Sequence, residues 1–329
     1  MTMDAPAAVN NAVADKVREV ESWLKARIIG QEVLVQRLLM ALLCGGHLLV
    51  EGAPGLAKTR AIKELASAVE GDFHRVQFTP DLLPSDITGT EIFRPETGEF
   101  RFQQGPIFHN LILADEVNRA PAKVQAALLE AMAEHQVSVG RESFQLPELF
   151  LVMATQNPIE QEGTYALPEA QLDRFLMHIE VGYPAASAEL DILKLVRSEQ
   201  QHQGGDSDAP PAMLTQADVF AARAQIFDVF MAPAVEQYII QLVMATRQRE
   251  GKLAQQLDFG VSPRASIALD QTARALAWLE GRDFVTPEDV QRVCPDVFRH
   301  RLIVSFDAEA QGVDANQIVA QLIQAVPVG

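Results

Sequence analysis

The sequence has little cysteine, no cluster of basic residues and no long apolar run, and each shortage excludes a class of protein. Only two cysteines, Cys44 and Cys294, occur in 329 residues, which excludes a disulfide framework and favours a reducing compartment. Acidic residues outnumber basic ones by 44 to 27, so the formal net charge is −17. Because an acidic surface repels phosphate backbones, we expect no sequence-independent binding of nucleic acid.

Segments that would insert into a membrane are also missing from the sequence. The longest near-apolar run, LLMALLC at 38–44, is too short to span a bilayer. The first residues, MTMDAPAAVNNAVADKVREVE, are acidic and contain no apolar signal-peptide core. We therefore expect a cytoplasmic protein without membrane insertion.

Short apolar runs alternate with helical patterns over roughly half of the chain, up to residue 184. Several of these runs are apolar almost throughout, as expected for parallel strands that are buried on both faces. We predict strands at 47–50, 74–78, 111–114, 149–155 and 175–181. Strands separated by helices indicate a doubly wound parallel sheet of the α/β class.

Beyond residue 184 the strand signals fade and helical patterns take over. The stretch QQHQGGDSDAPPA at 200–212 is typical of a loop or linker. Ser262-Pro263 and Thr286-Pro287 mark helix starts, since each pair places a capping hydroxyl before a proline. We predict an α/β domain over 1–184 with a helical segment at 10–27, a connecting helix and linker over 185–213, and an α-helical domain over 214–329.

Two further pieces of the sequence predict β-hairpins. IFRPETGEFRF at 92–102 has turn residues at 95–98. QVSVGRESFQL at 136–146 turns at Gly140-Arg141, where glycine suits a type II′ turn. Such hairpins are additions to the sheet, and they are either surface decoration or a contact surface for a partner.

The stretch EGAPGLAKTR at 51–60 joins a predicted strand to a predicted helix, which is the context of a phosphate-binding loop. Glycine lets main-chain N–H groups approach phosphate oxygens, and the helix N-terminus adds partial positive charge. Lys58 would reach the β- and γ-phosphates, and the Thr59 hydroxyl would bind Mg²⁺. Ala57 stands where a second glycine is common, and we expect alanine to be acceptable there if that backbone is already helical. The alternative is an ordinary loop with an exposed lysine.

Polar residues follow two of the predicted strands. In LILADEVNRAP at 111–121, Asp115 would hold Mg²⁺ through water, and Glu116 would act as the general base that polarises the attacking water. Asn157, in ATQNP, would hydrogen-bond the γ-phosphate or the attacking water. The alternatives are a solvated acidic pair at a strand end and a simple turn at Asn157.

Two arginines are candidates for contacts to phosphate. Arg174, beside Asp173 in LPEAQLDRFLMHIEV, is either a surface ion pair or an arginine finger that reaches the ATP of a neighbouring subunit. Arg264 lies in the first turn of a predicted helix, where a cation opposes the helix dipole. It is either a tolerated surface residue or a partner for a nucleotide phosphate.

The stretches GAPGLAKT, LILADEVNRAP, ATQNP, LPEAQLDRF and GVSPRA, in this order and spacing, resemble the MoxR family of AAA+ ATPases, in the helix-2-insert clade. The resemblance runs from about residue 28 to residue 305. It implies a P-loop AAA+ fold, with a doubly wound parallel sheet of five strands and a C-terminal α-helical lid. It also implies ATP and Mg²⁺ as cofactors. It further implies assembly into a ring, for which we expect six subunits, with ATP bound between neighbouring subunits.

The resemblance also assigns site residues by motif position. Asp115 and Glu116 match Walker B, Asn157 the first sensor, Arg174 the arginine finger and Arg264 the second sensor. The hairpins 92–102 and 136–146 match the clade's inserts. The residues that match Walker A, its following arginine and the adenine-pocket segment are Gly52, Ala53, Pro54, Gly55, Leu56, Ala57, Lys58, Thr59, Arg60, Ile29 and Gly30. Arg119, just past Walker B, is a weaker candidate for action across a subunit interface.

MoxR-type proteins are chaperone-like, so the resemblance implies an ATP hydrolase that remodels or activates a client protein. It further implies a role in metal or cofactor insertion and a partner with a von Willebrand factor A domain. The seven histidines show no ligand-like spacing, so we expect no protein-bound transition metal. Two alternatives stay open: a nucleic-acid motor, and a nucleotide-switched ring without a catalytic role.

Overall fold

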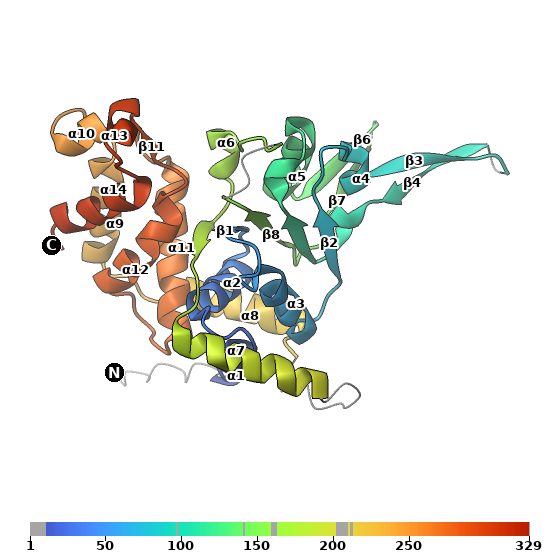
Figure 1. Ribbon diagram of the computed structural model, residues 1–329, viewed down its shortest axis with the longest axis horizontal. Coiled ribbons are helices and arrows are strands. Elements are labelled where there is room, and N and C mark those ends of the chain that lie inside the picture. The colour runs from blue at the N-terminus through green and yellow to red at the C-terminus, as the bar shows by residue number, and fades with distance from the viewer. Residues whose placement is uncertain are drawn as a thin grey trace, which may run out of the picture.

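The computed structural model describes residues 11–96, 98–140, 142–158, 163–201, 210 and 213–328 (Figure 1). Its centre is a parallel sheet of five strands in the order β2-β5-β8-β1-β9. These strands are β1 (Leu48–Gly52), β2 (Phe73–Gln77), β5 (Leu111–Asp115), β8 (Leu151–Gln156) and β9 (Met177–Val181). The five predicted strands and the α/β class are therefore confirmed.

Successive residues of a strand point to opposite faces of the sheet, and here both faces carry apolar side chains, so helices cover both faces. Leu48 and Val50 belong to a core shared with the first three helices, whereas Leu49 belongs to a second core under α5. The first three helices are α1 (Asn11–Arg27), α2 (Glu32–Cys44) and α3 (Lys58–Ala68). The second face carries α4 (Pro84–Thr88) and α5 (Ala122–Glu134). A sheet buried on both faces explains the nearly continuous apolar strand sequences.

The C-terminal part is a helical lid that packs on the first helices. Its longer helices are α8 (Gln216–Phe227), α9 (Pro233–Ala245), α11 (Pro263–Leu279), α12 (Pro287–Phe298) and α14 (Ala315–Ala325). Its short elements are α10 (Lys252–Gln256), β10 (Leu257–Phe259), β11 (Ile303–Val304) and α13 (Phe306–Ala310). Ser262 caps α11 and Thr286 caps α12, which confirms both predicted helix starts.

The lid and the sheet domain share one continuous apolar core. Both α8 and α11 pack on α2, so the predicted domain limits at 184 and 213 stay a prediction. The stretch 200–212, predicted to be a linker, falls almost wholly outside the described residues. Among the described residues, no helix combines the length and the apolar character needed to cross a membrane.

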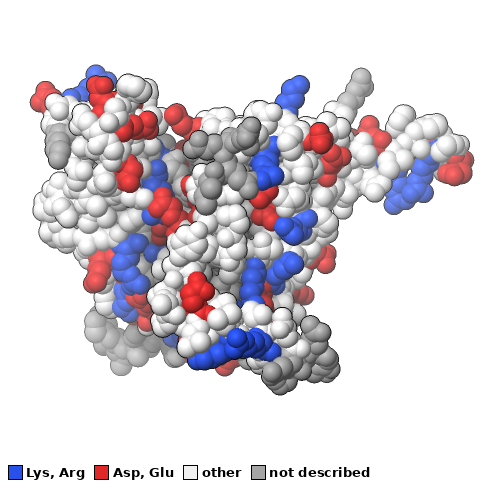
Figure 2. Space-filling model, viewed as in Figure 1, with Lys and Arg blue, Asp and Glu red and all other residues white. Residues whose placement is uncertain are grey.

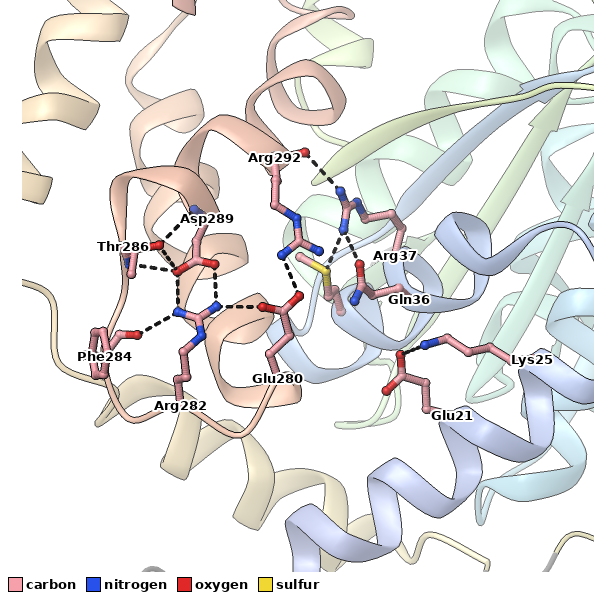
Figure 3. A network of polar contacts seen from close by, with 11 residues as sticks. Glu21, Lys25, Gln36, Arg37, Glu280, Arg282, Phe284, Thr286, Asp289 and Arg292 are labelled. Carbon is pink, nitrogen blue, oxygen red and sulfur yellow. Dashed lines mark hydrogen bonds and ion pairs between the residues drawn. The ribbon is translucent and has the colours of Figure 1, made fainter. Parts of the chain in front are cut away.

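Charged side chains fasten the lid to the body within this interface. Arg37 on α2 is buried, and its Nε donates to Asp296 Oδ2 on α12 at 2.7 Å. Its Nη2 donates to the main-chain oxygen of Arg292 at 3.0 Å, as Figure 3 shows. A second pair within the lid joins Arg282 to Asp289 at 2.6 Å. Removing one partner of a buried pair costs about 3–5 kcal/mol, so the Arg37–Asp296 pair holds the lid against α2, whereas the more exposed Arg282–Asp289 pair joins two parts of the lid itself.

The two predicted hairpins are confirmed and lie against each other. They are β3 (Gly89–Arg94) with β4 (Glu99–Gln104), and β6 (Gln136–Val139) with β7 (Glu142–Gln145). Phe102 and Phe144 join them, with stacked rings whose centroids are 4.0 Å apart. The β3–β4 hairpin extends far beyond the body of the molecule (Figure 1). The remaining elements are η1 (Pro106–Phe108), η2 (Val117–Arg119), α6 (Glu169–Leu172) and α7 (Ala186–Gln201).

His47 makes the stability of the fold depend on pH. Its buried ring lies 3.2 Å from the Met132 carbonyl oxygen at Nε2, and its Nδ1 accepts from the Val152 N–H at 3.1 Å. These partners hold the neutral ring, and burial lowers the pKa of His47 from 6.5 to about 4. We expect this group's stabilisation, up to about 3 kcal/mol, to be complete above pH 6.5 and to disappear as the pH falls toward 4.

Urea unfolding between pH 4 and pH 7.5 measures this effect. His47→Gln removes the titrating ring, so its free energy of unfolding should fall less steeply toward acid than that of the wild type. His300, whose pKa is lowered by burial and by the Arg301 guanidinium, acts in the same direction and leaves a residual slope in this variant. Equal slopes for the two proteins would show that His47 does not stay neutral.

Candidate nucleotide-binding site

The carboxyl ends of the central strands surround a cavity of about 370 Å³. Its walls are the loop after β1 and the first turn of α3, residues 54–60, together with Asp115, Glu116, Thr155 and Asn157. Carboxyl ends of parallel strands are the usual place for ligand crevices in α/β sheets. The structure thus brings together the predicted lysine, threonine, carboxylates and asparagine in one site.

The loop after β1 has the main-chain geometry of an anion site. Helix α3 begins at Lys58, and no side chain caps its N-terminus, so its first N–H groups are directed at the cavity. Gly55 has a φ of +84°, and a Cβ there would meet nothing within 4 Å. At Gly52 a Cβ would lie 2.7 Å from the Val181 oxygen, so strand packing requires glycine.

Ala57 corrects one expectation from the sequence. It lies in the left-handed region, with φ 58° and ψ 12°, immediately before α3. The condition under which alanine was expected to be acceptable, an already helical backbone, is therefore not met. An alanine in this conformation costs about 1–2 kcal/mol, a strain that is typical of functional loops.

The Lys58 ammonium lies over the cavity and is held by main-chain carbonyls. Its Nζ donates to the Gly52 oxygen and, at 3.2 Å, to the Gln156 oxygen. Burial lowers the pKa of Lys58, while the Asp115 and Glu116 carboxylates act in the opposite direction. A phosphate would replace carbonyl partners with charged ones, which form stronger hydrogen bonds with an ammonium.

Asp115 is buried and held by two side chains that the sequence analysis missed. The Thr155 hydroxyl donates to its Oδ1 at 2.6 Å, and Arg75 Nη2 donates to its Oδ2 at 2.6 Å. Thr155 is on β8 and Arg75 is on β2, the two neighbours of β5 in the sheet. These contacts fix the direction of the carboxylate toward the cavity.

Glu116 is held in an unusual conformation at the rim of the same cavity. Its φ is 57°, and its N–H donates to Thr155 Oγ1 at 2.9 Å. Its carboxylate accepts from Gln77 Nε2 at 2.8 Å and lies 3.0 Å from Arg119 Nε. Gln77 was also missed, although it ends β2 in register with Asp115. In the protomer, Arg119 therefore contacts Glu116 of its own chain.

A smaller cavity of about 150 Å³ adjoins the loop. Ile29, Leu56 and Ala57 line it on one side, and Pro184 with the inner face of α7 lines it on the other. Gly30 does not line it, but a Cβ there would come within 2.9 Å of Pro184, so this close approach requires glycine. The apolar residues of these walls suit a flat ring such as adenine, and the assignment of Ile29 and Gly30 to an adenine pocket stays a prediction.

The Arg60 guanidinium is paired with carboxylates of its own chain. Both of its terminal nitrogens donate to the Glu199 carboxylate on α7, and its Nε lies 3.5 Å from Glu64. Its position in the first turn of α3 still places it beside both cavities. The observed role of its side chain is to tie α7 to the phosphate loop.

Arg174 and Arg264 lie together near the amino ends of β1 and β9, at the opposite end of the strands from the phosphate loop. Arg174 lies shortly before β9, which begins at Met177, and both arginines line a separate cavity of about 260 Å³ with Gly46 and His47, which precede β1. Strands of five residues span roughly 16 Å, so the sheet separates these arginines from Lys58 of the same chain. Figure 1 shows α6 and α7, which flank β9, at opposite ends of the sheet.

The two guanidinium groups differ in their surroundings. Arg174 is half-buried, and its Nη1 donates to the Leu129 carbonyl on α5. Arg264 is exposed in the first turn of α11. Both arginines are directed away from their own phosphate loop, which is an arrangement suited to contact with another chain.

The residues present fit a magnesium nucleotide. The Thr59 hydroxyl and the Asp115 carboxylate line the same cavity and supply the oxygen ligands that Mg²⁺ prefers. Uncapped N–H groups and Lys58 fit phosphate oxygens. Among the described residues, no three or more His, Cys, Asp or Glu side chains are placed so that they could together hold a metal ion.

Comparison with known proteins identifies the family. A sequence model of the "ATPase family associated with various cellular activities (AAA)" matches residues 47–177, and a model of the "AAA lid domain" matches residues 249–322. Chaperone MoxR1 of Mycobacterium tuberculosis is 44% identical over 98% of this chain and 86% of its own length. The chain belongs to the MoxR family of AAA+ ATPases.

Other MoxR relatives agree with this assignment. Protein MoxR of Paracoccus denitrificans is 36% identical over 88% of this chain and 89% of its own length. A crystal structure from Cytophaga hutchinsonii, provisionally named an ATPase, has a TM-score of 0.87 and 42% identity over 97% of this chain and 96% of that one. The P-loop AAA+ fold, the helical lid, nucleotide binding and the class of ATP hydrolase are thereby established for this chain.

Proposed function

We propose that this MoxR-family chain is a Mg²⁺-dependent ATPase that works as a ring and remodels a client protein. The observation that carries the proposal is the separation of Arg174 and Arg264 from Lys58 by the length of the sheet. Arg174 and Arg264 line a different cavity from the phosphate site of their own chain, so in our proposal that site needs an arginine from elsewhere and the arginines need a phosphate from elsewhere. A neighbouring copy supplies both needs, so ATP turnover requires assembly.

Within the site, each residue has a distinct part in hydrolysis. Lys58 and the N–H groups of the loop bind the phosphate chain, and Asn157 orients the γ-phosphate or the attacking water. Glu116 accepts a proton from that water, and Gln77 with Arg119 sets the direction of its carboxylate. Arg174 of the next subunit stabilises the charge that develops on the γ-phosphate.

Thr59 and Asp115 would hold the magnesium ion, with Asp115 acting through water. Bound there, the ion neutralises charge on the β- and γ-phosphate oxygens. Thr155 and Arg75 keep the Asp115 carboxylate oriented for this role. Ile29 and the inner face of α7 would enclose the adenine.

The name and shape of related proteins support the chaperone-like part of the proposal. One relative is named a chaperone, and another, 28% identical over 58% of this chain, is named a magnesium-chelatase subunit. We propose a hexameric ring in the cytoplasm that serves metal or cofactor insertion with a von Willebrand factor A domain partner. The β3–β4 hairpin exposes Ile92, Phe93 and Phe100, which suits contact with a protein client.

The surface charge favours a protein client over nucleic acid. On the face seen in Figure 2, the described basic side chains are interspersed with acidic ones and form no continuous stripe. Side chains of both signs also lie on the projecting hairpin (Figure 2). Together with the net charge of −17, this distribution gives little attraction for a phosphate backbone.

Phosphate release by the purified chain, measured together with its mass in solution, tests the proposal. We expect MgATP to promote assembly of the wild type and assembled protein to release phosphate. Lys58→Ala should lose ATP binding and turnover, whereas Lys63→Ala, an exposed lysine of the same helix, should keep both. A wild type that assembles with ATP but releases no phosphate would be a nucleotide-switched ring instead.

A further inference from the structure

One carboxylate lies between the two arginines at the far edge of the sheet. Asp173 immediately precedes Arg174, and its Oδ2 accepts from the Ser262 hydroxyl at 2.9 Å. Ser262 is the N-terminal cap of α11. Its Oγ also accepts a hydrogen bond from the Arg264 N–H at 3.1 Å, which restrains the main chain of Arg264. A single aspartate therefore links the finger segment of the sheet domain to the start of the lid helix that carries Arg264.

Arg301, beyond the end of α12, holds this aspartate from the other side. Its Nε donates to Asp173 Oδ1 at 2.8 Å, and its side chain is only 3% exposed. The same guanidinium donates to the carbonyls of Phe175 at 2.6 Å and Leu176 at 3.2 Å. It thus clamps the main chain on both sides of Arg174.

Burying the charged Arg301 guanidinium is costly, which indicates that its contacts with residues 173–176 serve to fix the position of that segment. Burial lowers the pKa of Arg301, and the Asp173 carboxylate opposes that change. The five donors of arginine form a rigid fork, and here that fork engages three residues in the segment 173–176. An apolar side chain would fill the space but would leave those carbonyls and the finger segment unrestrained.

We propose that Arg301 and Asp173 are positioning residues that hold Arg174 and Arg264 as one preassembled pair for the nucleotide of the adjoining subunit. This inference rests on the proposed function, since it concerns the same shared site. Transition-state stabilisation depends on groups that are already in place, and a misplacement of about 1 Å costs about 100-fold in rate. Loss of the clamp should therefore slow turnover without touching the phosphate loop of the same chain.

The test compares Arg301→Gln with Asp173→Asn, which keeps the size of the aspartate. We expect either variant to lower kcat for ATP by about 10-fold to 100-fold and to leave KM within about 2-fold, because the ATP pocket itself is intact. Arg301→Lys keeps the charge but lacks the fork, so it should recover little activity. Arg282→Gln is the control, since it removes another lid ion pair, with Asp289, and should leave kcat unchanged (Figure 3).

Mixed assemblies distinguish positioning from general damage. Arg301→Gln subunits keep a working phosphate loop, so equal mixing with Lys58→Ala subunits, whose arginines are intact, should restore part of the turnover. Mixing with Arg174→Ala subunits should restore none, because both variants are deficient on the same side. If Arg301→Gln melts well below the wild type, Asp173→Asn decides the question in the same mixtures.

The outcomes separate this inference from the proposed function. If Arg174→Ala itself keeps full turnover, the shared site is wrong and the inference falls with it. If Arg174→Ala is inactive while Arg301→Gln and Asp173→Asn turn over ATP at the wild-type rate, only the positioning role is wrong. A lowered kcat with an unchanged KM and one-sided rescue supports it.

Discussion

Arg174→Ala is expected to bind ATP as the wild type does and to hydrolyse it about 10³–10⁵-fold more slowly. The loss is large because the arginine acts on charge that exists only in the transition state. Binding should survive because Arg174 lies at the opposite edge of the sheet from the phosphate loop. Titration with a fluorescent ATP analogue measures binding, and single-turnover phosphate release measures the chemical step.

Mixing experiments show whose nucleotide the arginine serves. Arg174→Ala subunits have an intact phosphate loop, and Lys58→Ala subunits have an intact finger. Where the two adjoin in a ring, one complete site forms, so a mixture should release phosphate although neither variant does so alone. Arg249→Ala, an exposed lid arginine outside the site, is the matched control and should behave as the wild type.

Two results would contradict this account. A mixture with no activity at any ratio would argue that Arg174 does not complete a site on another chain. Equal loss of ATP binding and turnover in Arg174→Ala would show that the residue supports the pocket of its own subunit. In the protomer the guanidinium contacts the Leu129 carbonyl, so transfer to a phosphate exchanges a neutral partner for a charged one.

The sheet was predictable because its strands are buried on both faces. Leu111 to Ala114 are all buried, and such runs have no polar alternation that a surface strand would show. The helix starts at Ser262 and Thr286 were predictable for a local reason, since each cap depends on residues within one turn. The phosphate loop and the strand-end carboxylates follow the same local logic.

The residues that the sequence did not reveal depend on register between strands. Thr155, Arg75 and Gln77 touch the Walker B carboxylates only because β8, β5 and β2 are neighbours in a particular alignment. Nothing in the spacing of 75, 77, 115 and 155 along the chain encodes that alignment. Ala57 shows a different limit. The phosphate-loop pattern was visible in the sequence, but the left-handed backbone conformation of this residue was not.

The place of Arg264 is a consequence of how the lid packs. The sequence predicts a phosphate contact at this position but does not say which chain supplies the phosphate. Long-range contacts determine where Arg264 lies: α11 packs on α2, and Arg37 pairs with Asp296, 259 positions along the chain. These contacts direct Arg264 toward Arg174 and away from Lys58.

Glu116→Gln is expected to retain ATP binding and to lower turnover by about 10²–10⁴-fold. A glutamine of the same size can still accept from Gln77, but it cannot take a proton from water. Asp115 would not replace it as a base, since its carboxylate, oriented by Thr155 and Arg75, is the one that would hold the magnesium ion. Equilibrium binding and single-turnover hydrolysis separate the two effects.

The matched control for this variant is Glu130→Gln, an exposed glutamate on α5 that should keep full turnover. Full turnover in Glu116→Gln would move the base to another group. A simultaneous loss of ATP binding would show instead that the carboxylate supports the structure of the pocket. If the prediction is right, Glu116→Gln rings stay loaded with ATP, so a client held only in that state co-purifies with them and is released when ATP is removed.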